Sequence, residues 1–357
     1  MTDQNLSLPD DILCRVRNLR IQFKTDEGVM TALEGVNYDI PKSGTLGLCG
    51  ESGSGKSVST KALMQLLSKN AIVDPASQIL FRKRDGSVID INSLNPGSRE
   101  TRELRGGEIG MIFQEPMASF SPVYSIGNQM SEAIRLHLRS DGNKITTGIE
   151  GRKLSKAEAR KVAVEMLDRV GIANASLRFD QYPHELSGGM RQRAMIALAL
   201  STSPSLLIAD EPTTALDVTI QAQILDLLQE LQDELGMSVV FITHDMGVIA
   251  QVSDIVAVMY LGRIVEQGTM EDVVFDSHHP YSKGLIEAIP SLDKLDERLK
   301  SVPGDIPGPF DRPAGCSFSN RCEQRIAGLC RKIAPDYAML NDHHVVRCHL
   351  YNEGSGA

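Results

Sequence analysis

Tryptophan is absent from this 357-residue chain, and the other aromatic residues are few, with seven tyrosines and nine phenylalanines. A surface rich in aromatic rings for stacking nucleic-acid bases is therefore not expected. The net charge of −9 points the same way, because nucleic-acid-binding proteins usually carry a basic excess or a basic stripe. We expect no nucleic acid among the partners of this chain.

Long apolar runs are also missing. No stretch of about 18 apolar residues occurs, so no helix is expected to span a bilayer. Residues 1–11 are polar and acidic, and they lack the basic and apolar segments of a secretory signal. We therefore expect a cytosolic chain. If it works at a membrane, other subunits must span the bilayer.

The apolar residues that are present form short runs typical of buried strands and amphipathic helices. Helices are predicted over 57–67 and 220–235. Strands are predicted over 12–24, 45–50, 205–210, 238–243 and 255–260, and around 264–265. Apolar strands that alternate with helices indicate a largely parallel sheet covered on both faces. The predicted fold class is therefore α/β.

Two segments depart from this alternation. Residues from about 116 to 185 show helical periodicity over 129–138 and 156–170, and they predict a helical insertion into the α/β core. Its polar and basic middle, 139–156, is predicted to be a solvated loop that leads into a helix. From residue 290, five prolines in 24 residues exclude long helices and mark a separate C-terminal module over 290–357.

A glycine-rich loop follows the strand predicted over 45–50 and matches the Walker A pattern G-x-x-x-x-G-K-S. Small residues let backbone N–H groups converge on phosphate oxygens, and the following helix directs its positive end toward them. Lys56 supplies a positive charge for the β- and γ-phosphates, and the Ser57 hydroxyl suits Mg²⁺. This Walker A loop predicts a site for a nucleoside triphosphate, built from Gly50, Glu51, Ser52, Gly53, Ser54, Gly55, Lys56, Ser57 and Val58.

Two acidic residues end the strand predicted over 205–210. Asp210 is suited to reach Mg²⁺ directly or through water, and Glu211 is suited to polarise an attacking water. Taken alone, an Asp-Glu pair after an apolar strand is also a common helix start. The Walker A loop upstream favours the catalytic interpretation, known as the Walker B pattern.

A second candidate anion site lies in the signature segment, residues 186–190. Ser187 can cap the helix that follows, and Gly188 and Gly189 expose backbone N–H groups. One chain therefore carries two devices for binding phosphate.

These motifs resemble, in order and spacing, those of the nucleotide-binding subunits of ABC transporters, and the resemblance covers nearly the whole chain. The signature segment is similar to the family's signature motif, which usually ends in Gln where this chain has Met190. Gln114 matches the Q-loop and Asp217 the D-loop, while His244 matches the switch histidine and Phe23 the aromatic residue that stacks on adenine. The resemblance implies an ABC-type nucleotide-binding domain over 12–289, with its helical subdomain at about 116–185.

The resemblance also implies roles for single residues. Ser57, Gln114 and Asp210 would hold Mg²⁺. Glu211 would be the general base, and His244 would hold the γ-phosphate. Two such subunits would stack head to tail, so that Ser187, Gly188 and Gly189 serve the partner's ATP.

An assembly at a membrane follows from the same resemblance. The implied partners are a second homologous ATP-binding subunit, which favours a heterodimer, two transmembrane permease subunits and an external solute-binding protein. The chain would lie peripherally at the cytoplasmic face of the inner membrane, and ATP hydrolysis would drive solute import. A soluble ABC ATPase of the translation or DNA-repair type is the alternative. The single cassette and the short helical insertion disfavour it.

The six cysteines include four near the C-terminus, spaced C-x5-C-x7-C-x17-C. This spacing lacks the C-x2-C pairs of zinc ribbons, but four thiolates suit either zinc or an iron–sulfur cluster. Residues 279–281, 302–307, 312–316 and 320–322 resemble the C-terminal region of peptide-importer ATPases. Several of those ATPases hold a [4Fe–4S] cluster, so the resemblance favours the cluster, with zinc or free thiols as alternatives. The four-cysteine site comprises Cys316, Cys322, Cys330 and Cys348. Cys49 is expected in the core, and His343, His344 and His349 on the surface.

The resemblance does not identify one transported solute. The resembling family imports dipeptides and oligopeptides, and some of its members carry nickel or oligosaccharides. Residues 118–124, which follow the Q-loop, are similar to the sugar-importing branch. An ATP-binding subunit does not touch the solute, so the sequence offers only this hint.

Overall fold

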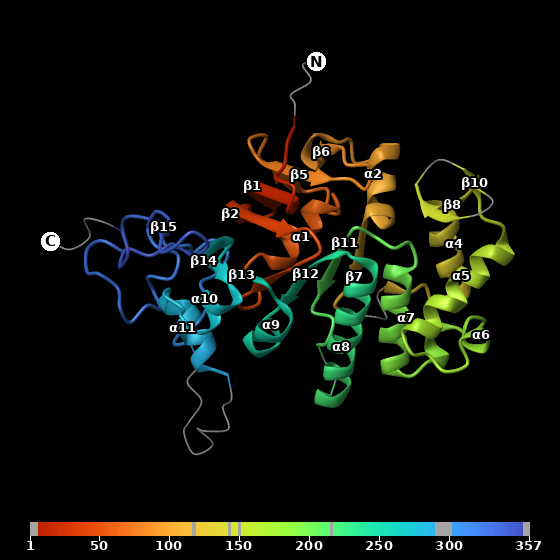
Figure 1. Ribbon diagram of the computed structural model, residues 1–357. Helices are drawn as coiled ribbons and strands as arrows, with labels where there is room; N and C mark the ends of the chain where they lie inside the picture. The colour runs from red at the N-terminus through yellow and green to blue at the C-terminus, as the bar shows by residue number, and fades with distance from the viewer. Residues whose placement is uncertain are drawn as a thin grey trace. The chain divides into compact units, whose positions relative to one another are not determined.

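The computed structural model describes residues 6–115, 119–141, 144–148, 151–214, 217–289 and 302–352 (Figure 1). The chain forms two compact units. Unit 1 comprises residues 1–81 and 241–357, and unit 2 comprises residues 82–240. Unit 1 therefore combines both ends of the chain, whereas unit 2 is one continuous segment.

The N-terminal part of unit 1 is antiparallel. Strand β1 (Ile12–Thr25) pairs along its length with β2 (Gly28–Pro41), and it also pairs with β4 (Ala71–Val73) and β5 (Gln78–Arg82). The predicted strand over 12–24 is confirmed by β1.

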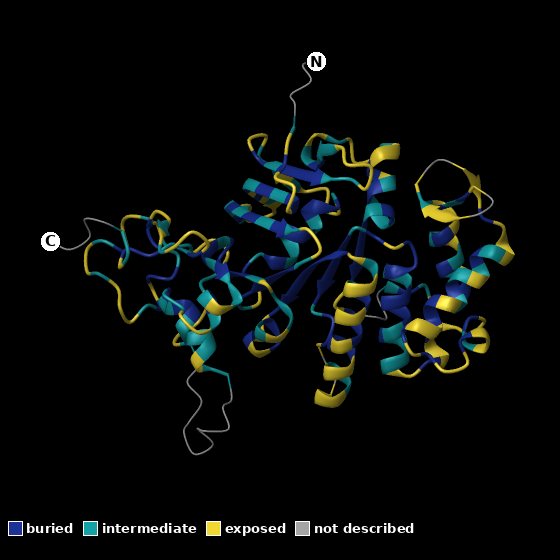
Figure 2. Cartoon of the chain, viewed as in Figure 1, coloured by how far each residue is buried: buried dark blue, intermediate teal, exposed yellow. Residues whose placement is uncertain are grey.

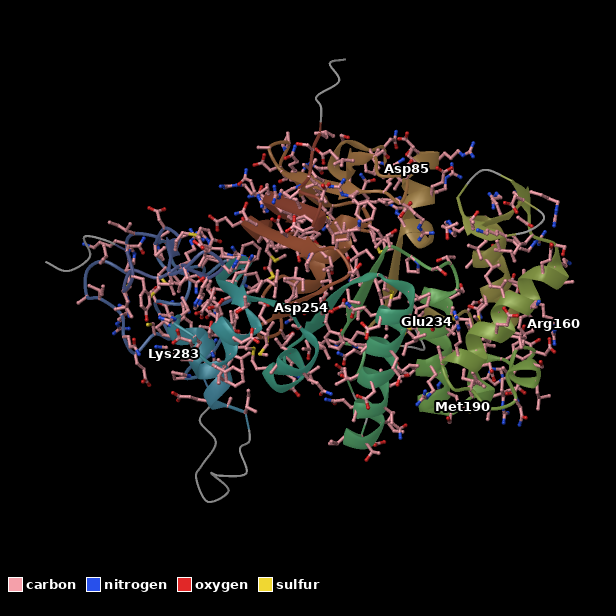
Figure 3. The ribbon with its side chains drawn as sticks, in the orientation of Figure 1. Asp85, Arg160, Met190, Glu234, Asp254 and Lys283 are labelled. Carbon is pink, nitrogen blue, oxygen red and sulfur yellow. The ribbon has the colours of Figure 1, made fainter. Side chains whose placement is uncertain are left out.

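The rest of the sheet in unit 1 surrounds β3 (Thr45–Cys49), the strand before the Walker A loop. Every residue of β3 is buried, and β3 runs parallel to β13 (Ile255–Tyr260) (Figure 2). Asp254 precedes β13 and accepts a hydrogen bond from the backbone N–H of Thr45 at 2.7 Å (Figure 3). These contacts fix the strand from which the Walker A loop departs.

C-terminal residues extend this sheet. Strand β14 (Arg263–Thr269) is antiparallel to β13, and β16 (Val345–Val346) pairs with β14. Strand β15 (Ala338–Met339) pairs with β16 at the edge. Cys316, Phe318 and Cys330 share one hydrophobic core with Cys49 of β3. The described C-terminal residues thus pack into unit 1, while the predicted boundary at residue 290 lies outside the described residues.

Four helices of unit 1 are α1 (Lys56–Leu63), α9 (Met246–Val252), α10 (Met270–Val274) and α11 (Pro280–Glu287). The helix predicted over 57–67 therefore ends four residues early. Gln65 adopts φ of 49°, and its N–H bonds to Ala62 O while the N–H of Leu66 bonds to Lys61 O. This pair of bonds is a Schellman motif, which closes a helix whatever its apolar pattern.

Unit 2 contains the parallel strands β7 (Ile109–Ile112) and β11 (Leu206–Asp210). Strand β12 (Ser238–Thr243) begins in unit 2 and ends in unit 1. The predicted strands at 205–210, 238–243 and 255–260 are confirmed. Smaller elements are β6 (Val88–Asp90), α2 (Arg99–Glu103), the 3-10 helices Ile91–Ser93 and Pro183–Glu185, and the kinked turn Leu104–Glu108.

The helices of unit 2 include α4 (Ile126–His137), α5 (Lys156–Arg169), α6 (Ala175–Arg178), α7 (Gly188–Leu200) and α8 (Val218–Leu235). Helix α5 packs against α4, α6 and α7 (Figure 1). The helices predicted within 116–185 and over 220–235 are confirmed. Among the residues that the structure describes, no helix combines the length and hydropathy needed to cross a bilayer.

The prediction of a solvated loop over the basic segment 139–156 is wrong in part, because much of this segment forms a small sheet. Strand β8 (Leu138–Ser140) pairs with β9 (Ile145–Thr147) and β10 (Arg152–Lys153). This sheet is held by backbone hydrogen bonds, which leave no pattern in the sequence. Leu138 and Ser140 are buried on one side of β8 and hold the sheet in place. The predicted helix start is confirmed, since Ser155 caps α5 in a capping box with Glu158.

Candidate functional site

The backbone of the Walker A loop lies against its neighbours so closely that only glycine fits at two positions. Gly50 has φ of 145°, and a Cβ there would lie 2.1 Å from the carbonyl oxygen of Met259. Gly55 has φ of 103°, and a Cβ there would lie 2.6 Å from Leu33 Cδ2. The carbonyl of Ser54 accepts a hydrogen bond from Gly262 N at 2.7 Å. The loop is therefore held between β2 and the β13–β14 turn.

Lys56 begins α1 and directs its charge back into the loop. Its side chain is buried, and Nζ donates to the carbonyl oxygens of Gly50 (2.5 Å) and Glu51 (3.0 Å). Ser57 and Val58 follow in the first turn of α1 and are half-buried, and no acidic residue lies in that turn. The positive N-terminal end of α1 and the charge of Lys56 therefore lie at the same loop, an arrangement that suits a polyphosphate.

Two further predicted residues lie in unit 1. Phe23 is half-buried on β1, opposite Met30 of β2 and Ala71 of β4. His244 is exposed directly after β12. The next residue, Asp245, caps α9 by accepting from the N–H of Gly247 at 2.8 Å.

The Walker B residues stand at the end of β11 in unit 2. Asp210 is buried, with 5% of its surface exposed. Glu211 adopts φ of 49°, a left-handed conformation that costs energy for a residue with a Cβ. Its carboxylate accepts hydrogen bonds from Gln114 Nε2 at 2.9 Å and Thr214 Oγ1 at 3.0 Å. Unit 2 therefore brings the predicted Q-loop residue and the predicted general base together.

The signature segment forms the N-terminus of α7. Ser187 Oγ accepts a hydrogen bond from the N–H of Met190 at 3.3 Å, as predicted for a cap (Figure 3). Ser187 and Gly188 are exposed, and a Cβ at Gly188 or Gly189 would meet no atom within 4 Å. Internal packing therefore does not require glycine here, although glycine disfavours a helix. This surface is suited to close approach by an external group.

The D-loop residue Asp217 caps α8 by accepting from the N–H of Ile220 at 2.9 Å. Residues 215 and 216 of the predicted D-loop lie outside the described residues. The predicted site residues thus fall into two sets. Unit 1 holds the Walker A loop, Phe23 and His244, and unit 2 holds Gln114, the signature segment, Asp210, Glu211 and Asp217.

Two residues far along the chain also contact the Walker A loop, and the sequence motifs do not assign either of them to the nucleotide site. Tyr281 accepts a hydrogen bond from the N–H of Glu51 at 2.8 Å, and Arg321 forms an ion pair with the Glu51 carboxylate. Arg321 lies 270 residues from Glu51 along the chain, so no local pattern could have paired them.

The four-cysteine site gathers four free thiols, three of them buried and Cys322 half-buried. Burial raises the pKa of Cys316 to about 11 and that of Cys348 to about 12, and neighbouring cysteines of the site act in the same direction. The backbone N–H of Ile326 donates to Cys330 Sγ at 3.2 Å. Such donors stabilise thiolate charge.

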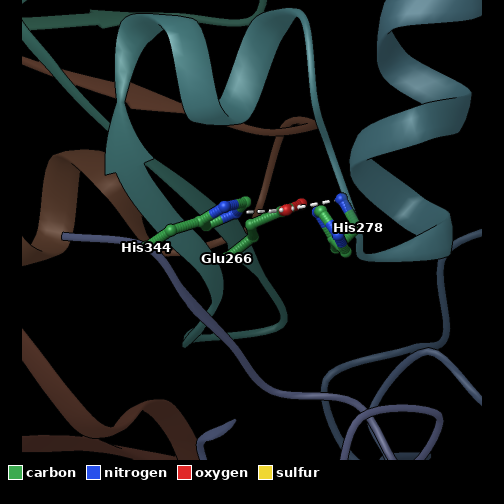
Figure 4. A group of neighbouring side chains, drawn as sticks. All are labelled: Glu266, His278 and His344. Atoms are coloured by element: carbon green, nitrogen blue, oxygen red, sulfur yellow. Dashed lines mark hydrogen bonds and ion pairs between the residues drawn. The ribbon is translucent and has the colours of Figure 1, made fainter. Parts of the chain in front are cut away.

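A second polar group, Glu266 with His278 and His344, brings three potential ligand atoms within 4.8 Å of one another (Figure 4). The buried Glu266 carboxylate accepts from His278 N (2.6 Å), His279 N (3.1 Å) and His344 Nε2 (2.9 Å). Both carboxylate oxygens thus have hydrogen-bond partners within the protein, as a buried polar group requires. The expected surface position of His344 and His349 is wrong, because both are buried; His343 is exposed. The burial of Cys49 is confirmed.

Two segments of the sequence match models of known protein families. Residues 33–214 match the family model described as ABC transporter. The chain belongs to the ABC transporter family. Residues 265–330 also match the model described as the oligopeptide/dipeptide transporter C-terminal region. This match confirms the predicted resemblance to the C-terminal region of peptide-importer ATPases.

Relatives cover almost the whole of this ABC protein. It is 44% identical over 95% of its length to a putative peptide import ATP-binding protein of Brucella melitensis, covering 97% of that relative. It is 42% identical over 95% of its length to the dipeptide transport ATP-binding protein DppD of Bacillus subtilis, covering 94% of that protein. A solved ATP-binding cassette, dimeric in a post-hydrolysis state with ADP and phosphate, is 26% identical with a TM-score of 0.59. The match covers 72% of this chain and 99% of the cassette.

The contact at Gly50 predicts the effect of adding one methyl group. We expect Gly50→Ala to lower the free energy of unfolding by about 3 kcal/mol, because the Cβ meets the Met259 carbonyl and the φ is unfavourable. Gly53→Ala is the matched control, since its φ is also positive but its Cβ meets nothing within 4 Å. Urea unfolding of the full chain measures both variants. Equal losses of stability would contradict the steric account.

Proposed function

We propose that this chain is the ATP-hydrolysing subunit of an importer that carries peptides across a membrane. The proposal depends on one combination: a Walker A loop, an exposed signature segment and a C-terminal region of the oligopeptide/dipeptide type in a single chain. The names of the relatives, which are peptide import and dipeptide transport ATP-binding proteins, support the same solute class. A soluble translation or DNA-repair ATPase finds no support among them.

The residue roles follow from chemistry at each position. Lys56 and the first turn of α1 would neutralise the phosphates, and Ser57, Gln114 and Asp210 would ligate Mg²⁺. Glu211 would orient and deprotonate the attacking water as general base. Its strained backbone and its hydrogen bond from Gln114 support this role, since strain of this kind clusters at functional sites. His244 would hold the γ-phosphate.

The signature segment would act on the ATP of a second chain. Two glycines with open space beside them support contact with an external group, and the similar solved cassette is dimeric. The partner would be a homologous ATP-binding subunit. Two transmembrane permease subunits and an external solute-binding protein would complete the importer, with this chain peripheral at the cytoplasmic face of the inner membrane.

The four-cysteine site would hold a [4Fe–4S] cluster. Four neighbouring thiols, one of which accepts a hydrogen bond from a backbone N–H, match the ligands of such clusters. When bound, the cluster would supply redox or structural chemistry at this place.

The proposed general base predicts a separation of binding from turnover. Glu211→Gln is expected to bind ATP normally and to lower the rate of hydrolysis by about 100-fold or more, because the amide cannot accept the proton. Glu230→Gln, at an exposed position of α8, is the matched control and should hydrolyse ATP at the normal rate. Nucleotide titration and phosphate release by the purified chain measure the two properties.

The same variants test the solute in cells that depend on this chain. Uptake of labelled dipeptides and oligopeptides should fail with Glu211→Gln and persist with Glu230→Gln. Near-normal hydrolysis by Glu211→Gln would refute the assignment of the base. A loss of oligosaccharide or nickel uptake with normal peptide uptake would refute the solute class.

The cluster proposal predicts a metal content. The full chain purified without oxygen should contain about four iron atoms and four acid-labile sulfides. Cys330→Ser should lose most of this iron, whereas Cys14→Ser, at a buried position in β1, should keep it. One zinc per chain, or full iron in Cys330→Ser, would contradict the proposal.

A further inference from the structure

An ion pair joins the Walker A loop to the C-terminal region within unit 1. Arg321 Nη1 lies 2.6 Å from Glu51 Oε2, and Arg321 Nη2 lies 3.0 Å from Glu51 Oε1. The two parallel contacts make a bidentate pair, the arrangement that fixes geometry as well as charge. The Arg321 side chain is only 4% exposed and that of Glu51 26% exposed, so water screens the pair weakly.

The guanidinium of Arg321 is held in place by groups other than Glu51. Its Nε donates to Pro303 O at 2.8 Å, and Nη2 donates to Val302 O at 3.3 Å. Its Cζ also lies 5.7 Å from the ring centroid of Tyr260 and 5.9 Å from that of Phe318. Arg321 is thus a rigid anchor, to which Glu51 attaches.

The backbone of Arg321 belongs to a turn between two residues of the four-cysteine site. The N–H of Ser319 bonds to Cys316 O at 3.0 Å. The N–H groups of Arg321 and Cys322 both bond to Phe318 O, each at 3.0 Å. The position of the guanidinium therefore depends on the turn that links Cys316 to Cys322.

Glu51 is held by its backbone as well. Its N–H donates to Tyr281 Oη at 2.8 Å, and the Tyr281 ring packs on Tyr260 at 4.7 Å and Phe318 at 5.3 Å between centroids. The second residue of the Walker A loop is therefore fixed at two points. One point is Arg321, and the other is Tyr281, whose ring packs on the two rings beside Arg321.

We infer that Arg321 is a positioning residue for nucleotide binding, which acts by holding Glu51 and with it the first half of the Walker A loop. The C-terminal turn between Cys316 and Cys322 is then a structural part of the nucleotide site. The inference rests on the proposed function, in which this loop binds ATP.

Electrostatics alone predicts the opposite result for one variant. A carboxylate in a phosphate-binding loop repels phosphate, so neutralising Glu51 should strengthen nucleotide binding if loop geometry did not depend on the pair. If the pair positions the loop, Glu51→Gln should weaken binding instead. This variant keeps the shape of the side chain and changes a partly exposed position, so the fold should survive.

The experiment measures the Kd for Mg·ADP by titration calorimetry on the full chain, with the melting temperature of each variant recorded. Glu51→Gln and Arg321→Gln should each raise the Kd by about tenfold. The double variant should bind no more weakly than either single variant, because both remove one interaction. Arg331→Gln is the matched control, an exposed arginine that also adjoins a cysteine of the site, and its Kd should be unchanged.

An unchanged or lower Kd in Glu51→Gln would overturn the inference, as would a double variant whose effect is the sum of the two. A lower melting temperature with unchanged Kd would reduce Arg321 to a purely structural residue. If Arg321→Gln does not fold, the Kd values of Glu51→Gln and Arg321→Lys decide whether the pair positions the loop.

The variant Lys56→Ala separates failure of this inference from failure of the proposed function. If wild type binds nucleotide and Lys56→Ala does not, normal binding by Glu51→Gln refutes this inference alone. If wild type fails to bind, both proposals fall.

Discussion

The close approach of the Walker A backbone to the β13–β14 turn is the constraint from which the nucleotide site follows. At Gly50 the chain lies too near the Met259 carbonyl for any side chain, and Gly262 bonds to Ser54 from the other side of the turn. A loop held this rigidly presents its N–H groups and Lys56 in one arrangement before a ligand arrives. Little conformational entropy then opposes nucleotide binding.

The C-terminal region adds to this constraint. Cys316, Phe318 and Cys330 share a core with Cys49, which ends the strand before the loop. Glu266, buried in β14, holds His344 and the N–H groups that precede α11. Because Tyr281 and Arg321 both reach Glu51, the residues beyond β14 complete the surroundings of the Walker A loop. Removing this region would leave the β14 edge and the loop without these partners.

Local patterns in the sequence predict the strands and motifs well, and they fail where distant contacts or backbone geometry decide. Apolar runs identify β3, β11 and β13, and the cap at Ser187 forms as expected. The early end of α1 depends on the left-handed Gln65, and β8 depends on backbone pairing within a basic segment. His344 is buried because Glu266, 78 residues away, binds it. The apolar pattern of α1 does not encode the conformation of Gln65, and nothing in the sequence near His344 encodes Glu266 as its partner.

The central claim is that the Walker A loop of one chain is completed by the signature segment of another. Two copies of this chain serve as partners in the test, and two variants are mixed: Lys56→Ala, which disables the loop, and Ser187→Arg, which blocks the exposed signature. Neither should hydrolyse ATP alone, when wild type measured in parallel does. A mixture should regain hydrolysis, because the intact loop of one chain meets the intact signature of the other. If the mixture stays inactive while both variants are folded and associate, the signature does not serve a second chain.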